Sequence, residues 1–174
     1  MSPATIQLLR VFHILTGAFW VGAVLFMVLI LLPALRNVGP ASGQVMEQLT
    51  AVRKLPIYMS VAPLITVLSG LGLYWNASNG FSGQWMHSGP GRTFGVGAAL
   101  ALIVMIMGMS INAPTGKRLG KLGGEIRAQG GPPNAAQQAE LHKLHARMGM
   151  AMTAAAVLLV LALGAMSLAR YMPA

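Results

Sequence analysis

The residues best suited to chemistry lie near the start of the chain, in the segment RVFHILTGAFWVG. This apolar run carries Arg10 and His13, and helical spacing places both on one stripe with Gly17 and Trp20. A charge or an imidazole in such a run is costly unless it reaches an interface, pairs or binds a ligand. Arg10 and His13 are therefore the first candidates for a functional site.

His13 has three roles open to it. Arg10 lies at the boundary of the apolar run, where its long side chain can extend to the interface, whereas the shorter His13 lies about one turn deeper. Its ring N–H can bond a carbonyl or hydroxyl of another helix. Alternatively, the ring can ligate haem or copper, or it can contact a proton or a substrate.

A ligand role for His13 needs a partner at the same depth, and Met166 is the candidate. Met166 stands four residues before Arg170, as His13 stands three after Arg10, so antiparallel first and last helices would bring the two level. A His and Met pair suits haem or copper, although the alignment can also arise by chance. The candidate cofactor-binding residues are His13, Met166 and Arg10, with His13 as the candidate metal ligand and haem b or copper as the cofactor.

Two further groups of side chains could bind a metal. Methionines alternate in MIMGM and MGMAM, but alternation by two spreads them around a helix, which favours filling of gaps in a core. His142 and His145 can share a metal near Glu140, or remain solvated.

The chain has no cysteine. We find no nucleophile–base arrangement, glycine-rich phosphate loop or intramembrane carboxylate pair, and we do not expect an enzyme.

The elements that must position these residues are transmembrane helices. Of the 174 residues, 55% are hydrophobic and 9% are charged, which is unlike a soluble domain. Four stretches lack Asp, Glu, Lys and Arg, and each has about 22 or more residues, enough to cross a roughly 30 Å hydrocarbon core. We predict an all-α integral membrane four-helix bundle, one domain over residues 1–174, with helices at about 5–35, 55–77, 92–114 and 146–171.

The first of these helices differs from a signal peptide. Its apolar run is about twice as long as a signal core, and Arg10 abuts it directly. We expect it in the mature protein. Small residues spaced by four predict close helix packing at Ala18 and Gly22, Thr66 and Gly70, and Gly97 and Ala101.

The basic residues predict the orientation of the bundle. The formal net charge is +9, and most of the Lys and Arg lie in or beside the segments 36–54 and 115–145. We predict that both segments are cytoplasmic loops, with both termini outside a bacterial-type inner membrane. Residues 37–43 should form a turn, 44–54 a short amphipathic surface helix, and Asn134 the N-cap of another helix. Anionic lipid, not nucleic acid, accounts for the charge.

Two segments carry a family resemblance. FHILTGAFWVGAVLF, with His13 seven residues before Trp20, and MEQLTAVRKLPIYMSVAPLITVLSGLGLYW resemble the first two helices of HemJ-type protoporphyrinogen oxidases and the related CopD-like copper-resistance membrane domains. The resemblance covers about the first 75 residues and implies a membrane protein of four or five helices. In HemJ-type enzymes it implies a haem associated with an essential histidine of the first helix, a position that His13 occupies here.

The second half is less similar to the HemJ pattern. Residues 93–116 lack the lysine and histidine of the HemJ third helix, and the fourth helix lacks its Asn-Glu-x-Pro motif. The resemblance is therefore closer to small CopD-like membrane proteins than to the oxidases. We expect a haem- or copper-associated membrane protein that uses His13.

The alternative is a non-catalytic structural or accessory subunit of a larger respiratory or photosynthetic membrane complex. In either case we expect the lipid bilayer as a partner, together with a membrane protein or a second copy of the chain, and no nucleic acid.

Overall fold

The computed structural model describes residues 1–39 and 42–173, and within these ranges it contains helices and no strand. The described residues include four helical segments that are long and apolar enough to cross a membrane. These are Pro3–Val38, Leu55–Ala77, Gly89–Ala128 and Ala135–Tyr171. The prediction of an all-α chain with four such helices is confirmed.

Two of the four segments consist of α-helices joined without a break by a π-helical turn. The first is α1 (Pro3–Phe26), the turn Met27–Leu31 and α2 (Leu32–Val38). The third is α6 (Gly89–Met107), the turn Gly108–Asn112 and α7 (Ala113–Ala128). The remaining elements are α3 (Ser42–Glu47) with the π turn Gln48–Val52, α4 (Leu55–Ala77), α5 (Gly83–Met86), α8 (Ala135–Leu168) and the 3₁₀ turn Ala169–Tyr171.

The second helix has the predicted bounds, 55–77, whereas the other three are longer than the sequence predicts. The third runs on through Pro114, which follows the wider π turn Gly108–Asn112 directly. The fourth begins at Asn134, whose side chain accepts from the Gln137 N–H in a capping box, as predicted for this N-cap. Most of the segment predicted as a loop at 115–145 is therefore helical. In the predicted turn at 37–43, Gly39 has a φ of 67°, while residues 40–41 lie outside the described residues.

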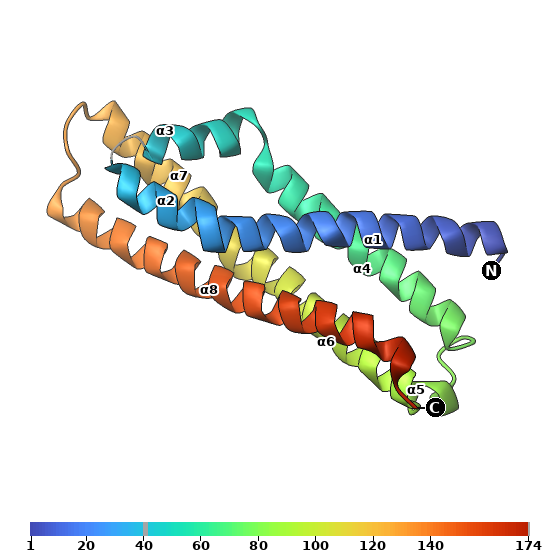
Figure 1. The fold of residues 1–174 in the computed structure, drawn as a ribbon. Helices are drawn as coiled ribbons and strands as arrows, with labels where there is room; N and C mark the ends of the chain where they lie inside the picture. The colour runs from blue at the N-terminus through green and yellow to red at the C-terminus, as the bar shows by residue number, and fades with distance from the viewer. Residues whose placement is uncertain (40–41, 174) are drawn as a thin grey trace.

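The bundle consists of two helix pairs. Helix α1 packs mainly on α4, and α6 packs mainly on α8, with smaller contacts from α1 to α8 and from α4 to α6 (Figure 1). All four helices meet at one buried cluster, formed by Trp20, Val24, Ala62, Val104, Ala155, Ala156 and Leu159. The N-terminal half of α1 and the C-terminal half of α8 diverge from this centre (Figure 1).

The small residues have unequal roles in this packing. A Cβ at Gly97 would lie 3.0 Å from the Met166 Cε and 3.2 Å from the Ala162 carbonyl oxygen, so α6 and α8 approach closely there. The prediction for Gly22 is wrong, because a Cβ there meets nothing within 4 Å and Gly22 is exposed. The four-residue spacing of Ala18 and Gly22 marks a face of α1, but that face points away from the other helices.

The two ends of the bundle differ in chemistry. At one end, the Tyr74 ring stacks edge-on to Trp85 at 5.1 Å and its hydroxyl donates to the Gly91 carbonyl at 3.1 Å, which folds the segment between α4 and α6 onto the helices. At the other end, ion pairs connect α7 to its neighbours. Arg118 of α7 pairs with Glu140 of α8, and Arg127 pairs with Glu47 of α3.

Candidate functional site

His13 lies in the interface of α1 and α4, half-buried, with Nδ1 2.8 Å from the backbone oxygen of Thr66. A carbonyl oxygen can only accept, so Nδ1 is the donor. In a neutral imidazole the proton on Nδ1 leaves the lone pair on Nε2, which has no hydrogen-bond partner within the described ranges. The structure therefore shows the predicted bond across the bundle, and it fixes which ring nitrogen is available to a ligand.

Threonine hydroxyls reinforce this contact. The Thr16 and Thr66 hydroxyl oxygens lie 2.7 Å apart, one donating to the other across the α1–α4 interface. The Ser69 hydroxyl donates to the Ile65 carbonyl at 2.6 Å and lies 3.1 Å from the Thr66 carbonyl, which accepts from His13. Thr66 and Ser69 are both buried. These hydrogen bonds hold the α4 carbonyl and the imidazole in one arrangement.

Gly70 leaves the space that the imidazole fills. A Cβ at position 70 would lie 2.8 Å from Cε1 of His13 and 3.0 Å from its Nδ1, closer than side chains pack. The predicted close packing at Thr66 and Gly70 is confirmed, since Thr66 also contacts the position of a Cβ at Gly17 at 3.4 Å. The sequence spacing predicts that Gly70 packs closely against another helix, but it does not indicate that His13 is the residue that packs there.

The other two candidate cofactor residues lie apart from the His13 ring. Arg10 is exposed on the turn of α1 before His13 and forms no ion pair within the described ranges. Met166 packs against Gly97 in the α6–α8 interface. His13 contacts α4 in the half of α1 that diverges from the C-terminal half of α8 (Figure 1). The geometry thus gives no support to Met166 as a second ligand.

The alternating methionines point in several directions, as expected. Met150 is 70% exposed, whereas Met152 is only 8% exposed. In the part of the chain that the structure describes, no group of three or more His, Asp or Glu residues is placed to hold a metal ion.

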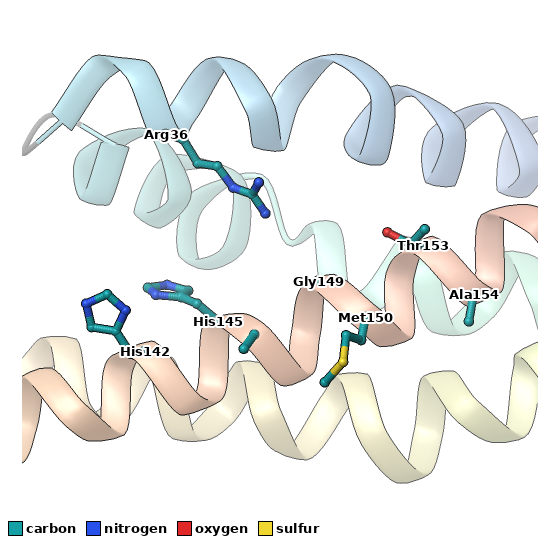
Figure 2. Close-up of a pocket in the computed structure, with 8 residues that line it drawn as sticks. Arg36, His142, His145, Gly149, Met150, Thr153 and Ala154 are labelled. Carbon is teal, nitrogen blue, oxygen red and sulfur yellow. The ribbon is translucent and has the colours of Figure 1, made fainter.

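His142 and His145 line a groove between α2 and α8, together with Arg36. The cavity has a volume of 740 Å³, and we call it the α2–α8 groove. Figure 2 shows Arg36 extending from α2 toward α8, with both imidazoles on the facing side of α8. Burial, His142 and the Arg36 charge together lower the pKa of His145. The sequence identified the histidine pair but missed Arg36, because only the bend of the chain back to α8 brings it near them.

Searches for relatives give no match to this chain among protein-family models, curated proteins or solved structures.

Proposed function

We propose that the chain is a multi-pass protein of a bacterial-type inner membrane that binds haem b through Nε2 of His13, with both termini outside. One observation carries the proposal. The bond from Nδ1 to the Thr66 carbonyl holds the ring in the tautomer in which Nε2 is a free base. Histidines that bind metals are commonly oriented in this way, with the second ring N–H donated to a carbonyl or carboxylate.

Haem fits this site better than copper. A single histidine is a sufficient protein ligand for haem iron, since the porphyrin supplies four nitrogens. Copper sites draw two or more ligands from the protein, and Met166 lies in a different interface from His13. Arg10, exposed one turn before His13, is suited to pair with a haem propionate. When bound, the haem would supply one-electron chemistry, while the α4 carbonyl keeps His13 oriented.

The resemblance of the first two helices to HemJ-type and CopD-like proteins supports the same proposal. In the HemJ-type enzymes the histidine of the first helix is haem-associated, and His13 occupies the matching position. The third-helix lysine and histidine of those enzymes are missing here. We therefore propose a CopD-like haem-binding membrane protein without oxidase activity.

The test is an absorbance spectrum of the chain purified from cells supplied with haem. The parent protein should show a Soret band, and His13→Ala should lose it while retaining its helical far-UV circular dichroism. His142→Ala is the matched control and should keep the band. Met166→Leu should also keep it, because the side chain lies against Gly97 and not against His13. A parent protein that carries no haem under these conditions would refute the proposal.

A second function, that of a non-catalytic accessory subunit, rests on a different observation. Helix α1 has no buried residue before Trp20, and side chains such as Leu8, Ile14 and Leu15 are 57%, 63% and 64% exposed. This apolar surface needs a cover of lipid or of another membrane protein. A chain that lacks haem but co-purifies with one stoichiometric membrane partner, and loses it on Ile14→Ser substitution, would support the second function instead.

A further inference from the structure

The α2–α8 groove combines a cationic end with an apolar end. Four of its lining residues on α8 fall on one helical stripe, at spacings of three and four from His142 through His145 and Gly149 to Thr153. Arg36 lies close to the α8 backbone at Gly149, where an added Cβ would be in ordinary van der Waals contact with a guanidinium nitrogen at 3.7 Å. The groove is completed by Ala146, Met150 and Ala154.

Among the residues that the structure describes, no carboxylate lines the groove. The three acidic residues of the chain pair with other cations, Glu47 with Arg127, Glu125 with Lys121 and Glu140 with Arg118. Arg36 is the charged group that α2 presents to the groove, and it forms no ion pair within the described ranges. Within the described ranges, therefore, no acidic side chain compensates the positive charge at this end of the groove.

His145 lies beside His142 and Arg36 at the basic end of the groove. Burial lowers the pKa of His145, and His142 and Arg36 lower it further by repulsion. Lys143 and Arg147 add positive charge on the neighbouring turns of α8. An anion placed among these groups would offset the repulsion at His145 and favour its protonation.

The other end of the groove belongs to the apolar part of α8. Met150, Thr153 and Ala154 lie in the stretch 148–169, which carries no Asp, Glu, Lys or Arg. Met150 is 70% exposed, so its side chain is available to an apolar ligand. A small hydrated anion would gain nothing from this surface, whereas an acyl chain would cover it.

We propose that the α2–α8 groove is a binding site for one anionic phospholipid, with the phosphate between Arg36 and the two histidines and an acyl chain along Met150 and Ala154. A guanidinium is well suited to a phosphodiester because it donates two parallel hydrogen bonds. Basic pockets between membrane helices on the cytoplasmic side bind anionic lipid headgroups in this manner. The inference does not depend on haem binding, since His13 lies at the α1–α4 interface.

The experiment measures the thermal unfolding of the detergent-purified full chain against added phosphatidylglycerol, phosphatidylcholine or inorganic phosphate. Phosphatidylglycerol should raise Tm in a saturable manner, and the other two should not. Native mass spectrometry should show one tightly retained phosphatidylglycerol. An equal rise in Tm with inorganic phosphate would refute a lipid site, and an equal rise with phosphatidylcholine would refute a requirement for negative charge.

Two variants locate the site, and a third serves as the control. Arg36→Gln should weaken phosphatidylglycerol binding by about five-fold, the effect of one basic residue at an anionic headgroup. Gly149→Leu keeps every charge but fills the groove and should also weaken binding. Arg53→Gln removes a charge from an exposed residue outside the groove lining and should bind like the parent. If Arg36→Gln and Arg53→Gln weaken binding equally, the lipid is held by general charge and the proposal fails.

Discussion

Replacement by alanine should affect the stability of the protein differently at Gly70 and at Gly22, although both glycines lie in apolar helices. At Gly70 the added methyl would lie 2.8 Å from the His13 Cε1, and at Gly22 it would meet nothing within 4 Å. Gly70→Ala should therefore destabilise the protein, because the imidazole must move and release the Thr66 carbonyl. Gly22→Ala should leave stability unchanged or raise it.

The comparison of the two variants isolates the contact at His13. Alanine favours a helix over glycine by about 1 kcal/mol, and this gain applies to both variants and cancels in the difference. Overpacking of a tight contact costs about 1–3 kcal/mol. Loss of a hydrogen bond between membrane helices adds about 0.6 kcal/mol. Gly70→Ala should thus be less stable than Gly22→Ala by about 2–4 kcal/mol.

The assay is reversible unfolding by SDS in mixed micelles, followed by far-UV circular dichroism. The free energy of unfolding is obtained for the parent and both variants at the same detergent composition. In a double variant, Gly70→Ala with His13→Ala, the added methyl no longer meets an imidazole. This variant should therefore regain the part of the unfolding free energy that Gly70→Ala loses through overpacking. Equal stability of Gly70→Ala and Gly22→Ala would refute the placement of His13 against Gly70.

Three further outcomes are expected. Asn134→Ala removes the capping box of α8 and should reduce stability by about 1 kcal/mol in the same SDS titration. The folded protein holds the pKa of His145 below its ordinary value, so the unfolded chain takes up this proton first as the pH falls. Tm in lipid-free detergent should therefore drop as the pH falls below about 6.5, and less in His145→Asn. A periplasmic reporter fused after Ala174, which lies outside the described residues, should be active, and one inserted near Gly130 should be silent.

The four membrane-length helices could be predicted because their signal is local. A stretch without charges and long enough to cross a bilayer is visible in the sequence whatever surrounds it. The helix ends were predicted less well. Gly108 and Pro114 are typical of a helix end, yet the chain passes both in helical conformation because a π turn at Gly108–Asn112 precedes the proline. Asn134 was predicted correctly, because a capping box depends only on neighbouring residues.

The candidate site was only partly predictable, because it depends on contacts between distant residues. His13 was recognisable from the cost of an imidazole in an apolar run, but its partner is the backbone carbonyl of Thr66, which no side-chain pattern could reveal. Pairing His13 with Met166 assumed that antiparallel first and last helices would bring the two level. In the structure His13 packs against Gly70 of α4 and Met166 against Gly97 of α6, so the two side chains lie in different interfaces.

The π turn at Met27–Leu31 determines the direction in which the side chains of α2 point, relative to those of α1. In an uninterrupted α-helix, Arg36 would point about 120° away from Val24, since each residue turns the chain by about 100°. A π turn contains one residue more than an α-helical turn, so the twelve residues from Val24 to Arg36 rotate the chain as eleven would. The difference in direction is then about 20°. Arg36 thereby shares the direction of Val24, which packs in the core with Ala155 and Leu159 of α8. A homologue with one residue fewer within this turn would keep the guanidinium facing α8, whereas a deletion elsewhere between Val24 and Arg36 would rotate it away.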